Sequence, residues 1–210
     1  MLLYLIRHGE TDWNKQKRMQ GQMNIPLNDF GRHLAAETAV GLKDVPFDLA
    51  FTSPLIRAKE TAEIILKDRD VPVVEDYRIQ EMNFGIYEGL RCKGADCDID
   101  DPEFHNFFDA PEKYRAPKGA ETFEDFSKRL GDFLDEISDK DVLKDSTILV
   151  STHGAALCGL LRLIKNEPLQ NFWGKSVSKN CGVSIVEVKD HHFTVLAENI
   201  TYYTEQVADW

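Results

Sequence analysis

Two histidines in this chain each end a short apolar run and are each followed by glycine. Arg7, His8 and Gly9 follow the run at residues 2–6, and His153 with Gly154 follows a second run. An uncharged imidazole can attack phosphorus directly, and the resulting phosphohistidine divides one difficult transfer into two easier steps. The neighbouring arginine supplies donors for phosphate oxygens. The pattern therefore predicts phosphoryl transfer with His8 as the nucleophile.

The same chemistry places demands on other residues. Attack through one imidazole nitrogen requires the other to carry the proton and donate it to an acceptor, most simply a backbone carbonyl. Glycine at positions 9 and 154 lets backbone approach closely beside each histidine. The leaving alkoxide must be protonated as it departs, and Glu81 fits the role of that acid. A phosphate in the same pocket disfavours the carboxylate, so we expect the pKa of Glu81 to be raised.

The elements that position these residues alternate between strands and helices. Short apolar runs predict buried strands at residues 2–6, 49–52, 71–74, 147–150, 183–188 and 193–197. Helices are predicted from the cap Asn28 to about residue 42, from the cap Ser53 to about residue 67, after the cap Thr122, and over residues 155–164. The alternation predicts a three-layer α/β/α fold with a mostly parallel sheet and an antiparallel edge strand.

Parallel neighbouring strands bring the predicted site residues together. Arg7 with His8, Arg57, and His153 each lie just beyond a predicted strand or in the first turns of the next helix. Ligands of open α/β folds bind at this carboxyl edge of the sheet. Two guanidiniums, two imidazoles and helix N-termini would then hold a tetrahedral phosphate and the charge of its transition state.

Four ordered segments carry a resemblance to a known family. They are Leu5-Ile6-Arg7-His8-Gly9-Glu10-Thr11, Thr52-Ser53-Pro54-Leu55-Ile56-Arg57-Ala58, Gln80-Glu81-Met82-Asn83-Phe84-Gly85 and Leu149-Val150-Ser151-Thr152-His153-Gly154. In this order they resemble the histidine phosphatase superfamily, also called the phosphoglycerate mutase-like family, from about residue 3 to about residue 184.

The resemblance implies a role for each matched residue. Glu81 would act as general acid and then as base for the water that hydrolyses the phosphoenzyme. His153 would donate to the phosphate, and Asn14 would make a polar contact with it. Gln20 and Gly21 are expected to add a backbone contact.

Family members divide between phosphatases and mutases that move a phosphoryl group within phosphoglycerate. The mutases grip the substrate carboxylate with an adjacent arginine pair, and the comparable stretch here, residues 105–111, holds no arginine. The sequence therefore favours a metal-independent phosphomonoester hydrolase acting on a small phosphorylated metabolite. A phosphoglycerate mutase dependent on 2,3-bisphosphoglycerate is the alternative, and a non-catalytic phospholigand-binding module ranks third.

Composition limits the remaining choices. With 210 residues and 42% hydrophobic content, one domain over residues 1–210 is expected, with a cap-like insertion at about residues 91–118 over the active site. The aromatic residues of that insertion would form either an apolar wall around the leaving group or a small core of their own. They are Phe104, Phe107, Phe108 and Tyr114.

Charge and cysteine usage indicate the kind of partner and compartment. A net charge of −11 repels polyanions, so nucleic acid is not an expected partner, and no apolar run is long enough for a membrane span. The four cysteines show neither metal spacing nor a disulfide framework, which favours reduced thiols in the cytoplasm. The histidines outside the site have no acidic or thiol partner at metal spacing, so no metal or cofactor is predicted. Monomer and homodimer are both compatible with the sequence.

Overall fold

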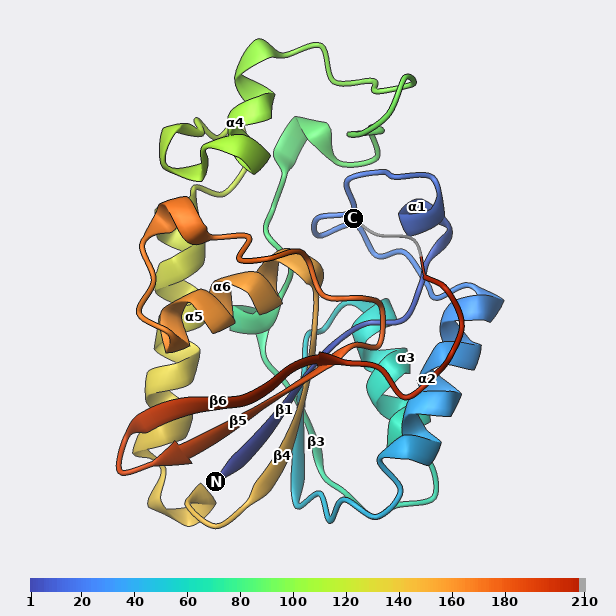
Figure 1. The fold of residues 1–210 in the computed structure, drawn as a ribbon, viewed down its shortest axis with the longest axis vertical. Helices are drawn as coiled ribbons and strands as arrows, with labels where there is room; N and C mark the ends of the chain where they lie inside the picture. Colours follow the sequence, from blue (N-terminus) through green and yellow to red (C-terminus); the bar gives the residue numbers. More distant parts are fainter. Residues whose placement is uncertain (208–210) are drawn as a thin grey trace.

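A six-stranded sheet forms the centre of the computed structural model, which describes residues 1–207 (Figure 1). The strands are β1 (Leu2–Arg7), β2 (Leu49–Thr52), β3 (Val73–Glu75), β4 (Thr147–Thr152), β5 (Val183–Lys189) and β6 (His192–Ile200). They lie in the order β3-β2-β4-β1-β5-β6. The first four are parallel, whereas β5 runs antiparallel to β1 and β6 runs antiparallel to β5. The predicted fold class is confirmed.

Helices cover both faces of this sheet (Figure 1). The pair α2 (Asp29–Gly41) and α3 (Ile56–Ile65) packs on one face, and the pair α5 (Phe123–Asp139) and α6 (Gly154–Ile164) packs on the other. Successive side chains of a strand point to opposite faces. Accordingly, Leu3 and Leu5 of β1 join the core beneath α5 and α6, while Ile6 joins the core beneath α2 and α3.

Side-chain caps define two of the helix starts as the sequence predicts. Asn28 accepts a hydrogen bond from the backbone N–H of Gly31 at the start of α2, and Thr122 accepts one from Asp125 at the start of α5. The buried residues of α5 form a single stripe, Phe123, Phe126, Leu130, Phe133, Leu134 and Ile137. This stripe holds α5 against the sheet because burial of one apolar face is the main source of helix stability in proteins.

Two predicted starts are wrong, and strands β4 and β6 end two and three residues later than predicted. Helix α3 begins at Ile56 with Leu55 as its N-cap, so Ser53 does not cap it. Strand β3 covers Val73–Glu75, which is shifted towards the C-terminus from the prediction of residues 71–74. Its three residues are all exposed, so no buried apolar face fixes where this edge strand starts.

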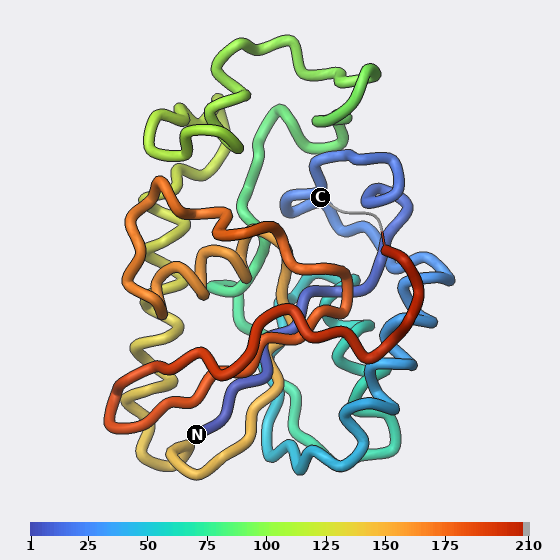
Figure 2. Tube along the Cα trace, in the orientation of Figure 1, coloured from blue at the N-terminus to red at the C-terminus, as the bar shows by residue number. Residues whose placement is uncertain are grey.

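Short elements complete the chain, namely α1 (Asp12–Lys15), α4 (His105–Asp109), η1 (Tyr77–Ile79), η2 (Gly85–Tyr87), η3 (Pro102–Phe104), η4 (Pro111–Lys113), η5 (Asp141–Leu143) and η6 (Leu169–Asn171). The insertion, drawn in green, lies beyond the carboxyl ends of the parallel strands (Figure 2). The insertion meets the segment after α6 through Trp173, whose indole N–H donates to the Phe107 carbonyl at 2.7 Å. No helix in the described part of the chain is long and apolar enough to cross a membrane.

Candidate active site

The register of the sheet brings three strand ends to one level. Arg7 of β1 lies opposite Thr152 of β4, and Thr52 of β2 lies opposite Ser151. A pocket with about 460 Å³ of empty space opens beside these ends. Eight of the nine predicted site residues line it, namely Arg7, His8, Asn14, Gln20, Gly21, Arg57, Glu81 and Gly154. His153 does not line the pocket, but its ring centroid lies 5.2 Å from that of His8.

His8 is held with one ring nitrogen bound and the other left for chemistry. Its side chain is buried, and Nδ1 lies 2.7 Å from the Gly9 carbonyl oxygen. A carbonyl can only accept, so Nδ1 carries the proton and Nε2 keeps its lone pair. Burial, followed by the charges of Arg57 and Arg7, holds the pKa of His8 well below its ordinary value of 6.5. The expected backbone acceptor is confirmed, and the imidazole is neutral.

Two guanidiniums flank this imidazole in the interior. Arg57 is fully buried, and its Nη1 and Nη2 donate to the carbonyls of Met23 and Gly21 at 2.8 and 2.7 Å. Arg7 is 4% exposed and donates from Nη1 to the Ser178 carbonyl at 2.6 Å. Burial lowers the pKa of Arg57 to about 10. Two cations that lose hydration to this extent favour an anion in the pocket, since buried charge is costly unless it is compensated.

Glu81 lies at the N-terminus of α6 and not in open solvent. Its Oε1 accepts from the backbone N–H groups of Met82 and Ala156 at 3.0 and 3.1 Å, and its Oε2 accepts from that of Ala155 at 3.1 Å. Burial raises the pKa of Glu81 above its ordinary value of 4.5, against the opposing effect of these bonds and of Arg57. The predicted direction is confirmed, although burial raises the pKa even before any phosphate enters.

His153 is oriented by Ser53, which the sequence predicts only as a helix cap. Its Nε2 lies 2.7 Å from Ser53 Oγ, and Ser53 Oγ accepts a bond from the Leu55 N–H at 3.3 Å. The Ser53 hydroxyl can either donate to Nε2 or accept from it, and donation would place the His153 proton on Nδ1. That Nδ1 is buried and has no hydrogen-bond partner among residues 1–207. Ser53, predicted as a helix cap, instead orients the second imidazole.

Three further polar residues line the pocket, Asn14, Gln20 and Gly21, and they differ in which of their atoms are hydrogen-bonded. Asn14 Oδ1 accepts from the Thr11 N–H at 3.0 Å, so the amide nitrogen is the group left for the pocket. Gln20 is buried, and its Oε1 finds no partner in the described structure. The Gly21 carbonyl accepts from Arg57, so this oxygen serves the arginine.

The sequence does not predict the role of Arg129, which fixes the segment that carries Glu81. From α5 it donates to three backbone carbonyls, those of Arg78, Gln80 and Glu81, at 2.6, 2.9 and 3.0 Å. Its position is held by Glu121, whose two carboxylate oxygens accept at 2.6 and 2.9 Å. The sequence offers no local signal for this role because each bond joins residues 48 to 51 positions apart.

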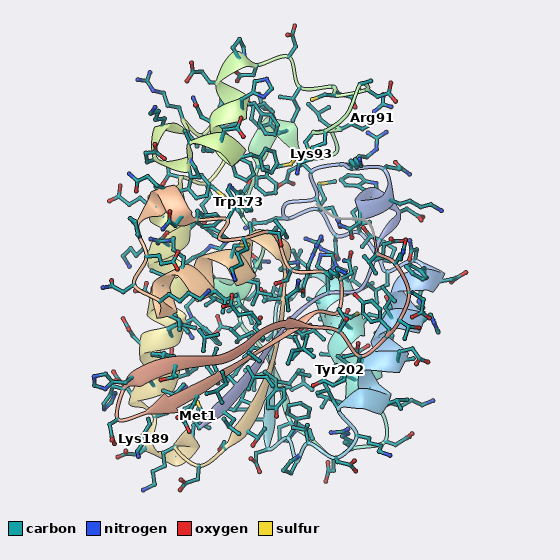
Figure 3. All side chains as sticks on the ribbon, viewed as in Figure 1. Met1, Arg91, Lys93, Trp173, Lys189 and Tyr202 are labelled. Carbon is teal, nitrogen blue, oxygen red and sulfur yellow. The ribbon has the colours of Figure 1, made fainter. Side chains whose placement is uncertain are left out.

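An apolar wall faces the charged end of the pocket. It consists of Met19, Phe84, Phe107, Phe108, Trp173 and Val177. Phe107 and Phe108 belong to the predicted insertion, and Phe107 packs edge-to-face with Trp173 at a centroid distance of 5.0 Å. Figure 3 shows Trp173 where the segment after α6 meets the insertion. Phe107 also stacks on Phe123 of α5, so the aromatic residues of the insertion form a wall and a small core at once.

Cations of the insertion do not extend the charged end. Arg91 pairs with Asp98 at 3.1 Å, and Lys93 lies over the Phe108 ring at 4.7 Å from its centroid. Neither lines the pocket, nor do Arg115 and Lys118. Within the described range no group of three or more His, Cys, Asp or Glu residues could hold a metal ion.

Comparisons with known proteins agree with this geometry. The model of the histidine phosphatase superfamily (branch 1) matches residues 3–201. The Bacillus subtilis (strain 168) protein called uncharacterized phosphatase PhoE is 36% identical over 157 residues, which cover 75% of this chain and 74% of the relative. Among solved structures, Bacillus stearothermophilus YhfR is 35% identical with a TM-score of 0.87, covering 96% of this chain and 98% of that one. The alpha-ribazole phosphatase from Shigella flexneri is 27% identical with a TM-score of 0.83, covering 98% and 100%.

Proposed function

Because the chain belongs to the histidine phosphatase superfamily, we propose that it is a metal-independent phosphomonoesterase that works through a phosphohistidine at His8. One observation carries this proposal. A buried imidazole of lowered pKa lines the same pocket as two buried guanidiniums, and because its Nδ1 is fixed on the Gly9 carbonyl, Nε2 is the nitrogen that keeps a lone pair. A nucleophile needs this state, and a tetrahedral dianion needs these cations.

In the first step the lone pair of His8 Nε2 forms a bond to phosphorus. The bond between phosphorus and the ester oxygen breaks, and its electron pair goes to that oxygen. The carboxyl of Glu81 supplies the proton that turns the departing oxygen into an alcohol. Arg7 and Arg57, which line the pocket, donate to the phosphoryl oxygens, whose charge is greatest in the transition state. The donor role of His153 stays a prediction, because this residue does not line the pocket.

In the second step Glu81 acts as a base. Water attacks the phosphohistidine, and its proton moves to the Glu81 carboxylate. The bond between phosphorus and nitrogen breaks, and its electron pair returns to His8 Nε2. Inorganic phosphate leaves, and the enzyme has its neutral imidazole and its carboxylic acid again. The raised pKa of Glu81 suits both steps, since a catalytic acid works best when its pKa approaches the working pH.

The wall of the pocket supports a preference among leaving groups. Aromatic and aliphatic side chains surround the space beyond the phosphate end, whereas the charged residues that line the pocket, Arg7, Arg57 and Glu81, serve the phosphoryl group. A leaving group with an aromatic or apolar body gains free energy by burial there. A carboxylate such as that of phosphoglycerate would be buried without a cation of its own, which disfavours the mutase alternative.

The test is a panel of phosphate esters assayed with a chelator present. We expect phosphate release from 1-naphthyl phosphate and from small alkyl phosphates, with a higher kcat/KM for the naphthyl ester. Acid-labile phosphate should be trapped on the peptide that contains His8, and His8→Ala should lose essentially all turnover. Ordinary kcat in His8→Ala, or a label on another residue, would refute the mechanism.

Substrate preference is tested separately by Trp173→Ala. Shortening the wall should raise KM for the naphthyl ester and leave KM for a methyl ester nearly unchanged. Val142→Ala is the control, because Val142 is 85% exposed and lies far from the pocket lining. A preference for phosphoglycerate or for its isomerisation would favour the mutase, and silence across the whole panel would favour the binding module.

A further inference from the structure

The peptide bond that follows the nucleophile is held from both sides by residues outside the pocket. The His8 carbonyl accepts from Asn180 Nδ2 at 2.9 Å, and the Gly9 N–H donates to Thr61 Oγ1 at 3.0 Å. Asn180 is 1% exposed, and Thr61 is fully buried. Neither lines the pocket. These side chains therefore act on the pocket only through other residues, and both of them contact the backbone of His8 and Gly9 directly.

That backbone controls the direction of the imidazole. The Gly9 carbonyl accepts the proton of His8 Nδ1, so the orientation of this carbonyl sets the orientation of the ring. Position 9 has to be glycine because a Cβ there would lie 2.6 Å from the Gly31 carbonyl oxygen of α2. Glycine restricts its own φ and ψ less than any other residue. The orientation of the His8 ring thus depends on the flexible backbone of Gly9, which other residues have to restrain.

The two restraining residues are themselves fixed by other parts of the site. The Asn180 carbonyl accepts from the Tyr203 hydroxyl at 2.5 Å, and Asn180 Nδ2 lies 3.5 Å from Asn14 Oδ1. The Thr61 hydroxyl donates to the Arg57 carbonyl at 2.7 Å, one helical turn earlier in α3. The network joins the nucleophile to a phosphate-binding arginine on one side and to the segment after β6 on the other.

We propose that Asn180 and Thr61 are positioning residues for His8, and that Tyr203 holds Asn180 in place. This inference rests on the proposed role of His8 as nucleophile. The two side chains fix the peptide plane that precedes the Gly9 Cα, and the peptide that follows it carries the carbonyl that accepts from Nδ1. They thereby restrain this carbonyl, which keeps the proton on Nδ1 and the Nε2 lone pair directed at the phosphate. Preorganisation of this kind matters because a misplacement of roughly 1 Å can cost about 100-fold in rate.

The test combines kinetics with nitrogen-15 NMR of the His8 ring, which reports the tautomer without any turnover. The variants are Thr61→Val, Asn180→Ala and Tyr203→Phe. We expect Thr61→Val and Asn180→Ala to lower kcat by about 10- to 100-fold with little change in KM. The His8 spectrum should change from the Nδ1–H tautomer to a mixture of both. Tyr203→Phe, which removes one hydroxyl only, should do the same to a smaller extent.

Matched variants separate positioning from general stability. Thr61→Ser keeps the hydroxyl and should restore kcat and the tautomer. Tyr202→Phe should behave as wild type, since the Tyr202 ring packs against Gly41 on the far side of the same segment. If Asn180→Ala does not fold, Thr61→Val and Tyr203→Phe decide the question.

Unchanged kcat with an unchanged tautomer in Thr61→Val and Tyr203→Phe would overturn the proposal. So would a fall in kcat that follows a fall in Tm while the tautomer stays the same. If wild type formed no phosphohistidine, the proposed function would fail. The spectra of the variants would still show whether these residues set the state of the His8 ring.

Discussion

At the scale of single residues, the site uses burial to set the charge of each group. Burial keeps both imidazoles neutral by lowering their pKa values, and it raises the pKa of the Glu81 carboxyl. The same burial lowers the pKa values of Arg7 and Arg57, but both guanidiniums stay charged at neutral pH. The pocket is therefore cationic at neutral pH even though the chain as a whole carries a net charge of −11.

Arg57→Ala should lower kcat/KM by at least about 10²-fold, the usual cost of removing one preorganised donor to a transition state. Arg57 also donates to the carbonyls of Gly21 and Met23 and so anchors their loop. The effect of losing this anchor has to be separated from the effect of losing a phosphate donor. Arg69→Ala is the matched control, because Arg69 donates to the carbonyls of Val45 and Leu42 in the same way but lies outside the pocket. Similar losses of activity in both variants would contradict a role of Arg57 in binding phosphate.

Glu81→Gln should slow the hydrolysis of alkyl phosphates far more than that of a nitrophenyl phosphate, whose leaving group needs no proton. Glu81 donates its proton only below its pKa, and burial raises that pKa, so wild-type phosphorylation of His8 should persist above pH 4.5 and then fall. In Glu81→Gln, the rate of His8 phosphorylation should no longer decrease as pH rises, so this alkaline limb of the profile should be absent. A stopped-flow profile of phosphoenzyme formation between pH 4 and 9 measures it, and an unchanged limb would assign it to another group.

At the scale of elements, close approach between α2 and the loop after β1 depends on glycine at position 9. Gly9→Ala should destabilise the protein by about 1 to 3 kcal/mol, because a new methyl in a filled space forces backbone to shift. Gly131→Ala in α5 is the opposite case, since its Cβ would meet no atom within 4 Å. It should stabilise by roughly 0.5 to 1 kcal/mol. Urea unfolding measures both, and equal effects would contradict this account.

The elements also show what a sequence can predict about such a site. Apolar runs end at Arg7, Thr52 and Thr152, and parallel pairing then forces the residues that follow to one edge. Ser53, Thr61 and Asn180 could not be found in this way. Their bonds to the two histidines and to Gly9 join residues 100, 52 and 172 positions apart, so only tertiary packing defines them. The sequence predicts Ser53 only as a helix cap, because serine before proline is also a common helix start.

At the scale of the whole molecule, His8 and His153 link stability to acidity. Their pKa values lie well below 6.5 in the folded protein, so below pH 6.5 the unfolded chain binds protons that the folded protein does not. Stability should therefore fall as pH drops below 6.5, by up to about 1.4 kcal/mol per pH unit for each histidine. Urea unfolding at several pH values should show this slope, and His153→Gln should reduce it.

His33 provides the control because its shift has the opposite sign. Glu205 raises the pKa of His33, so its stabilising effect is complete below pH 6.5 and is lost as pH rises through the folded value. His33→Gln should consequently lower stability by a constant amount below pH 6.5, and this loss should shrink as pH rises through the folded pKa of His33, so the slope of the curve changes only above pH 6.5. A flat curve below pH 6.5 in wild type would show that the two site histidines are not neutral.

The network from Tyr203 to His8 has a consequence for biosynthesis. His8 precedes Asn180 by 172 positions in the chain, so it is translated well before Asn180 and Tyr203, which support it. A nascent polypeptide stalled before position 180 already holds Arg7, His8, Arg57, Glu81 and His153, yet it lacks the contacts that orient the imidazole. The imidazole would thus take its working orientation only after the segment that carries Asn180 and Tyr203 has been translated and has folded onto the site.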